Sequence, residues 1–274
     1  MGIALAVLVH LSVVTPHRLY SKEGMMNDLT TQGVEAEQKG GLTSSLSRVL
    51  RVVYSPAQVF LELDRRPDWL VPLLICLLVA AISSWVLIPN VILPTQREAL
   101  ESRGLTEEQL EAARPWLEGN RPVYIGLATA LVFTALGLVV VAGIFHLVCA
   151  LLLGGQANFV RTFAVMVYSS IVIVPESIVK VPIQLITKSA EAHTSLALIL
   201  SAPEGSSVFA YRFLYRFLDQ VDIFALWKVV LIAVGLSVMF KFPRRKSYYV
   251  VGALWLVYAV VVSLVSGFVP HPTG

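Results

Sequence analysis

Five long apolar runs constrain the fold of this chain more than any other feature. They cover residues 69–88, 123–153, 159–186, 224–242 and 248–269. A helix of about 20 apolar residues crosses the roughly 30 Å hydrocarbon core of a bilayer. In lipid, backbone amides must be satisfied within a helix or a closed barrel, and these runs are continuous rather than alternating. The sequence therefore predicts an all-α, polytopic transmembrane helical bundle with five spans.

Composition agrees with a chain that is solvated mainly by lipid. Hydrophobic residues make up 56% of the 274 positions and charged residues 14%, whereas soluble domains carry about 25% charged residues. We divide the chain into a disordered tail (1–45), a five-span membrane domain (46–269) and a C-terminal tail (270–274). Within the first tail we expect the biological start at Met25 or Met26, so that residues 1–24 are a mis-called extension.

Basic residues before the first predicted span and between the last two predict the orientation in the membrane. They are Lys39, Arg48, Arg51, Arg65 and Arg66, then Lys241, Arg244, Arg245 and Lys246. Loops rich in Lys and Arg stay in the cytoplasm. With five spans, this rule predicts a cytoplasmic N-terminus and an external C-terminus.

Two amphipathic segments, 46–63 and 206–222, are predicted to lie at the membrane surface as short interfacial helices. Each could instead pack against the bundle. Residues in and beside these segments are candidate interfacial contacts: Arg48, Arg51, Phe60, Trp69, Asp219, Asp222 and Trp227.

The third predicted span contains two ionisable residues, Glu176 and Lys180. Charged groups at membrane depth are functional candidates by default. The two residues are four apart on one helical face, which favours an ion pair within the helix. Together with His146 of the second span they form a candidate intramembrane polar site. The alternative is that the pair sits at the outer end of a helix longer than the bilayer requires.

No motif for catalysis or for a cofactor is visible. The chain lacks G-x-S-x-G, H-E-x-x-H, P-loop and G-x-G-x-x-G patterns. His146 and Cys149 share a helical face, but two ligands are too few for a zinc site. The basic residues follow the spans rather than forming a basic domain, so nucleic-acid binding is not expected.

Two stretches of the chain have a recognisable pattern. The first is Ser55-Pro56-Ala57-Gln58-Val59-Phe60 followed by Arg66-Pro67-Asp68-Trp69, and the second is 218–227 with Gly235 and Trp255. Together they resemble the Yip (Ypt-interacting protein) domain family in its prokaryotic branch. The resemblance covers about residues 46–267. It implies five closely packed helices, a cytoplasmic N-terminus and a bacterial inner membrane. Eukaryotic members are associated with Rab-type GTPases and vesicle traffic, but the long N-terminal region that they use is only a short polar tail here.

Two functional hypotheses remain. The first is a non-enzymatic scaffold that binds the bilayer and other membrane or cytoplasmic proteins, with self-association also compatible with the sequence. The second is a small transporter or channel that uses Glu176, Lys180 and His146. A transporter should gather these groups around a cavity, whereas a scaffold should have a dry bundle.

Overall fold

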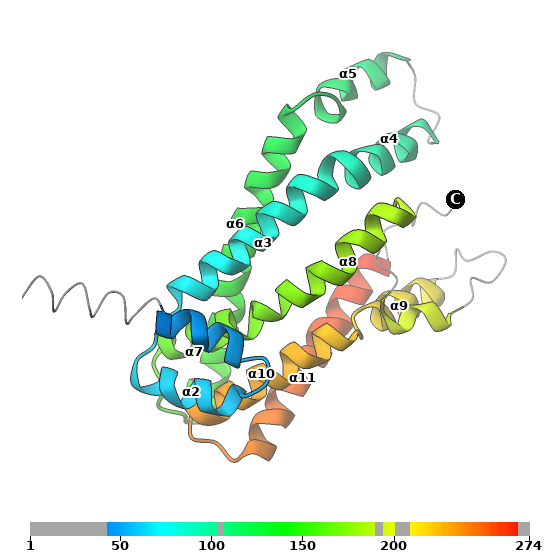
Figure 1. The fold of residues 1–274 in the computed structure, drawn as a ribbon. Coiled ribbons are helices and arrows are strands. Elements are labelled where there is room, and N and C mark those ends of the chain that lie inside the picture. Colours follow the sequence, from blue (N-terminus) through cyan, green and yellow to red (C-terminus); the bar gives the residue numbers. More distant parts are fainter. Residues whose placement is uncertain (1–42, 103–106, 190–193, 201–208, 268–274) are drawn as a thin grey trace, which may run out of the picture. The chain divides into compact units, whose positions relative to one another are not determined.

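The computed structural model describes residues 43–102, 107–189, 194–200 and 209–267 (Figure 1). The chain divides into two units, Met1–Ser44 and Ser45–Gly274, and the helical bundle is the second. Most of the predicted N-terminal tail, the whole C-terminal tail and residues 206–208 of the second amphipathic segment lie outside the described residues. No β-strand occurs within the described ranges, and the predicted all-α membrane bundle is confirmed.

The first two spans are longer than a bilayer requires. The first consists of α3 (Leu70–Leu87), η1 (Ile88–Ile92) and α4 (Leu93–Glu101), and the second of α6 (Arg121–Leu147) and η2 (Val148–Leu152). Helix α5 (Glu107–Leu117) lies between them. The first span continues without a break for 32 residues, from Leu70 to Glu101. At 1.5 Å per residue it is about 48 Å long, so α4 extends beyond the hydrocarbon core. Arg97 contacts Glu101 at 3.1 Å and Glu118 at 3.9 Å, which links α4 to the segment after α5.

The third span lies at the centre of the bundle. It is built from α7 (Phe159–Ser169), η3 (Ser170–Val172) and α8 (Ile173–Thr187). The side chain of Asn158 caps its start by accepting a 3.0 Å hydrogen bond from the Arg161 amide. The tighter η3 turn comes just before Pro175, whose missing N–H leaves a gap in the helical hydrogen bonds. Residues 162–172 are buried without interruption.

The last spans contain a sharp bend. The remaining elements are η4 (Leu196–Ile199), α9 (Phe209–Asp219), α10 (Ile223–Met239) and α11 (Arg244–Gly267). Among the described residues, four helices are long and apolar enough to cross a membrane alone, and α9 with α10, bent by 60°, provides the fifth span if the pair counts as one. Helix α9 packs against α11 and η4. The second amphipathic segment is therefore attached to the bundle through α11.

Helix α10 packs against α7, α11 and the short helix α2 (Pro56–Arg65). The contact is close because α10 carries Gly235 where a side chain would not fit. A Cβ atom at this position would lie 2.4 Å from Cγ1 of Val165 and 3.1 Å from Cζ of Phe60. Phe60 itself is completely buried. The core of the bundle is thus the region where α2, α7 and α10 meet.

Candidate functional site

Glu176, Lys180 and Asp222 form an ion triad between the third span and the start of α10. The Lys180 ammonium lies 2.7 Å from Oε1 of Glu176 and 2.6 Å from Oδ2 of Asp222. The first contact is the ion pair predicted from the spacing of four residues. The second joins residues 42 positions apart, and Lys180 therefore ties α8 to the point where the chain bends.

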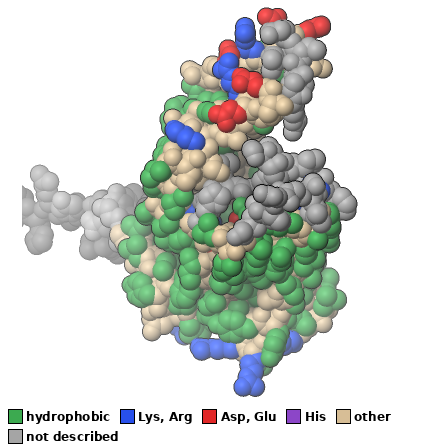
Figure 2. All heavy atoms as spheres, turned by 90° about the vertical axis from the view of Figure 1, so that its right-hand side faces the viewer, with side chains coloured by type: hydrophobic (Ala, Val, Ile, Leu, Met, Phe, Trp, Pro, Cys, Tyr) green, Lys and Arg blue, Asp and Glu red, His purple; other side chains and the backbone are tan. Residues whose placement is uncertain are grey.

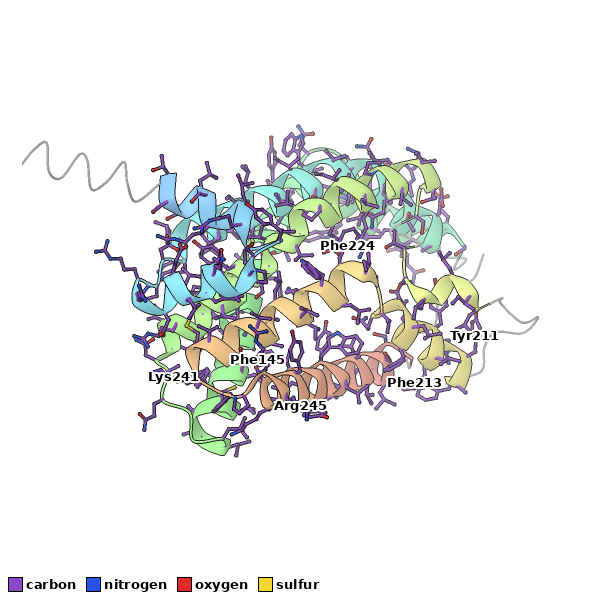
Figure 3. The ribbon with its side chains drawn as sticks, turned by 60° about the horizontal axis from the view of Figure 1, so that its bottom comes forward. Phe145, Tyr211, Phe213, Phe224, Lys241 and Arg245 are labelled. Carbon is purple, nitrogen blue, oxygen red and sulfur yellow. The ribbon has the colours of Figure 1, made fainter. Side chains whose placement is uncertain are left out.

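Asp222 has a second role as the N-cap of α10. Its Oδ1 accepts a 2.6 Å hydrogen bond from the Ala225 amide, while Oδ2 receives Lys180. Capping satisfies one of the four amides that a helix leaves free at its start. The Lys180 ammonium also lies 5.9 Å from the ring centre of Phe224. Figure 3 shows Phe224 and Lys241 toward opposite ends of α10. The triad therefore fixes the end of α10 that is remote from the basic turn.

A hollow of about 290 Å³ lies next to this triad. Its walls come from α3, α6, the third span and α10. Most of the lining residues are apolar: Cys76, Phe133, Gly137, Leu138, Val141, Met166, Ile173 and Ile232. The polar lining residues are Thr134, Ser170, Glu176 and Lys228. Two charged side chains, Glu176 and Lys228, reach it, while Lys180 does not line it. The sequence interpretation did not single out Lys228, although a lysine inside an apolar run was a sufficient signal.

His146 lies apart from the triad, near the opposite end of the bundle. Its Nδ1 is 3.2 Å from Oγ1 of Thr162, at the start of the third span. Its ring packs against Phe159 and Phe240, with ring centres 5.8 and 6.2 Å away. The structure thus brings two of the three proposed intramembrane residues together and leaves His146 elsewhere. Among the described residues, no three His, Cys, Asp or Glu side chains are grouped as metal ligands.

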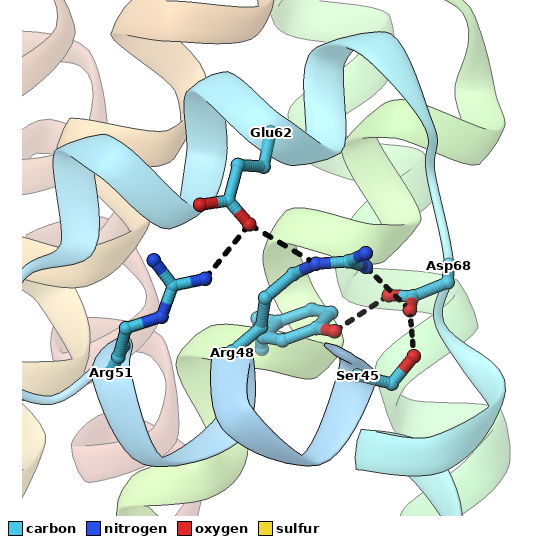
Figure 4. Close-up of polar contacts among 6 residues, drawn as sticks. Ser45, Arg48, Arg51, Glu62 and Asp68 are labelled. Carbon is cyan, nitrogen blue, oxygen red and sulfur yellow. Dashed lines mark hydrogen bonds and ion pairs between the residues drawn. The ribbon is translucent and has the colours of Figure 1, made fainter. Parts of the chain in front are cut away.

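A second polar cluster connects the segment before the first span to the third span (Figure 4). Asp68 is its centre: it accepts hydrogen bonds from Nη1 of Arg48 at 2.6 Å, from the Tyr168 hydroxyl at 2.6 Å, and from Ser45. Tyr168 is fully buried. A buried tyrosine hydroxyl needs such a partner, since leaving it unpaired costs about 1–3 kcal/mol.

Glu62 extends the same cluster on α2. It lies 2.9 Å from Nη2 of Arg51 and 3.2 Å from Nε of Arg48. The hydrogen bond from Arg51, followed by the positive charges of Arg51 and Arg48, lowers the pKa of the Glu62 carboxyl below its ordinary 4.5. The same hydrogen bond raises the pKa of Arg51. Two of the proposed interfacial residues, Arg48 and Arg51, are thus bound to acidic partners of this protein.

The other proposed interfacial residues have different surroundings. Phe60 faces the core, and the Trp69 ring meets Phe163 edge-on with centres 5.5 Å apart. Asp219 accepts a 2.9 Å hydrogen bond from Ser195, and Trp227 is exposed. Of the seven residues, Trp69 and Trp227 are the two whose side chains are exposed.

The surface separates into a broad apolar region and a basic end (Figure 2). Hydrophobic side chains cover the visible middle, Lys and Arg gather at the bottom, and mixed charges lie at the top. The basic end holds the turn between α10 and α11, where Figure 3 places Lys241 and Arg245. An apolar region of this extent, bounded by charge at each end, is the surface that a bilayer requires. The chain is a multi-pass integral membrane protein.

Comparison with known families then identifies the chain more closely. The model of the Yip1 domain family matches residues 50–265, which is well over half of the chain. The protein therefore belongs to the Yip1 domain family. Comparison with curated proteins finds no match, and neither does comparison with solved structures.

Proposed function

We propose that this protein is a non-enzymatic scaffold that binds other proteins at a membrane, in membrane organisation or trafficking. Membership of the Yip1 domain family supports this role, because the family is one of non-catalytic membrane proteins. The observation that carries the proposal is the placement of the polar side chains. The third-span charges are held in ion pairs with each other and with Asp222, and His146 is not among them.

The proposed binding surface is the hairpin formed by residues 45–65, which consists of the helical segment 45–51, the turn after it and α2. Val59, Phe60 and Leu63 attach α2 to the bundle. Leu50 and Tyr54 of the same hairpin are 66% and 71% exposed. The Arg48–Asp68 contact fixes the hairpin to the segment just before the first span. The hairpin is therefore held against the bundle and keeps an apolar outer face, which suits it to binding a protein partner.

The proposed orientation places the basic end in the cytoplasm. Arg48, Arg51 and Arg161 lie in or beside the hairpin, since Arg161 contacts Asp64 of α2 at 2.9 Å. The turn from Lys241 to Lys246 is near the same end, because Lys246 reaches the carbonyl of Leu153 in the loop before α7. By the positive-inside rule this end stays in the cytoplasm. The likeness to prokaryotic members favours a bacterial cell membrane.

A transporter or channel is the alternative, and the hollow beside Glu176 is the observation in its favour. Its weakness is continuity: the hollow contains Glu176 and Lys228 but not His146 or Lys180. Proteoliposomes loaded with a pH-sensitive dye distinguish the two functions. A proton or ion leak that requires Glu176 would support transport.

Site-specific photo-crosslinking in intact membranes tests the scaffold proposal. A photo-reactive residue replaces Leu50 or Tyr54 in the full chain, and Ile186 of α8, which is 83% exposed, serves as the control position. We expect the same discrete protein adduct from both hairpin positions and not from Ile186. If the hairpin positions give only lipid adducts, or the same adducts as Ile186, the proposal fails.

A further inference from the structure

The hollow bounded by α3, α6, the third span and α10 extends along the helices, and its two ends differ in their distance from the basic end. On α6 its lining runs from Phe133 to Val141, a rise of about 12 Å along the helix. On the third span it runs from Met166 to Glu176. The contact between His146 and Thr162 shows that α6 ends at the level where the third span begins. Val141 and Met166 therefore line the part nearer the basic end, and Phe133 and Glu176 line the part farther from it.

Helix α10 runs in the same direction as α6, with its C-terminal end nearer the basic end. It ends at Met239, just before the basic turn, so Ile232 lies nearer the basic end than Lys228 does. Helical side chains tilt toward the N-terminus of their own helix. The Lys228 ammonium is thus directed toward the same part of the hollow as Glu176. The hollow is an elongated groove with an apolar part around Cys76, Met166 and Ile232 and a charged part formed by Glu176 and Lys228.

The two charges in this groove are not neutralised in the same way. Oε1 of Glu176 forms an ion pair with Lys180, and this pair does not involve the second carboxylate oxygen of Glu176. Within the part of the chain that the structure describes, Lys228 has no carboxylate in ion-pair contact, and its side chain is exposed to the groove. A charged ammonium at membrane depth is costly unless water or an opposite charge contacts it.

We propose that this groove binds one zwitterionic aminophospholipid of the bilayer, with its phosphate on Lys228 and its ammonium on Glu176. Part of one acyl chain fills the apolar part, since a membrane groove without atoms would forfeit packing contacts along its walls. One positive and one negative group match a phosphoethanolamine headgroup, which carries one charge of each sign. A purely anionic headgroup would satisfy Lys228 and be repelled by Glu176. Basic side chains between membrane helices are known to bind lipid phosphates.

Two glycines of α6 provide a matched pair of variants that tests the groove. Gly137 lines the groove and Gly143 does not, and a Cβ atom at either position has nothing within 4 Å. Full-length protein is placed in vesicles containing phosphatidylethanolamine with a photo-reactive group in the middle of its acyl chain. Adducts are then located by peptide mass spectrometry.

We expect adducts on the α6 residues between Phe133 and Val141 in the unaltered protein. Gly137→Leu should lower their yield by roughly fivefold or more, because its side chain occupies the groove. Gly143→Leu should leave the yield unchanged. Equal yields in the two variants, or adducts spread evenly around the bundle, would overturn the proposal.

Native mass spectrometry with added lipids tests the headgroup. Phosphatidylethanolamine should bind more tightly than phosphatidylglycerol or phosphatidylcholine. Lys228→Met should weaken its binding by roughly tenfold, the loss expected for a charge-assisted hydrogen bond, while Arg245→Met at the basic turn should not. Glu176→Gln should weaken the preference over phosphatidylcholine, because the amide oxygen of the variant accepts a hydrogen bond from the ammonium but carries no negative charge. Tighter binding of phosphatidylglycerol would contradict the zwitterionic assignment, as would a Glu176→Gln variant that folds and keeps the full preference.

Discussion

Asp68 and Tyr168 lie 100 residues apart in the chain, and a 2.6 Å hydrogen bond from the tyrosine hydroxyl to the carboxylate joins them. The same carboxylate holds Arg48. A residue just before the first span thus connects the juxtamembrane hairpin to the buried centre of the third span. The hairpin is therefore part of the folded bundle rather than an appendage of it.

Removing either side of this contact should destabilise the protein. Tyr168→Phe removes the donor that the half-buried Asp68 carboxylate has at Oδ1 and should cost about 1–2 kcal/mol. Asp68→Ala removes the acceptor of three groups and should cost more, about 2–3 kcal/mol. Thermal unfolding in detergent measures both effects. Tyr249→Phe, at a residue that is 77% exposed, is the control and should be neutral. A neutral Asp68→Ala would refute the connecting role.

Gly235 should be intolerant of even a methyl group. Its Cβ would lie 2.4 Å from Cγ1 and 3.0 Å from Cγ2 of Val165, on a neighbouring helix. Gly235→Ala should therefore destabilise the bundle by about 1–3 kcal/mol, the usual cost of overpacking. Gly252→Ala on α11, where nothing lies within 4 Å, should be neutral or stabilising, because alanine favours helix. If the two variants melt at the same temperature, the helices are not packed as closely as described.

Asp222 should contribute to stability both as a cap and as the partner of Lys180. Asp222→Asn keeps a good capping side chain and loses the charge, whereas Asp222→Ala loses both. We expect Asp222→Ala to cost about 1 kcal/mol more than Asp222→Asn, the worth of a cap. Adding Lys180→Met completes a double-mutant cycle that isolates the ion pair. Additive effects in this cycle would mean that the triad does not hold the bend.

The basic end should lose stability in acid through Glu62. Its pKa is lowered in the folded state from the ordinary 4.5, so ionised Glu62 stabilises the fold at higher pH. This contribution is complete above about pH 5 and is lost as the pH falls through the folded pKa. Glu62→Gln should flatten the acid limb of a stability–pH curve, while Glu111→Gln on α5 should not. An unchanged acid limb would show that the Arg51 pairing adds no stability.

Features that depend on local sequence were predictable, and contacts between distant helices were not. Five apolar runs predict a helical bundle because lipid leaves the backbone few alternatives. Glu176 and Lys180 were paired correctly because a spacing of four places them on one helical face. The contacts of Lys180 with Asp222 and of Tyr168 with Asp68 depend on how helices meet, and no local pattern specifies them.

The surroundings of apolar residues were the least predictable feature. Phe60 belongs to an amphipathic pattern that predicts a buried face, but the pattern is the same whether that face meets lipid or protein. Lipid tails are as apolar as a protein core, so hydrophobicity alone does not separate the two. The glycine opposite Phe60, Gly235, was the available signal. His146 was grouped with Glu176 because both are polar residues in spans, although the two helices place them at different depths.

The basic end should face the cytoplasm, and cysteine labelling tests this orientation directly. Cys76 and Cys149, both buried, are replaced by serine or alanine, and one cysteine is introduced at Arg245 or at Glu111. A membrane-impermeant maleimide is then applied to intact cells. We predict that Glu111→Cys is labelled and that Arg245→Cys is labelled only after the membrane is opened. Labelling of Arg245→Cys in intact cells, with Glu111→Cys protected, would contradict the orientation and the cytoplasmic scaffold built on it.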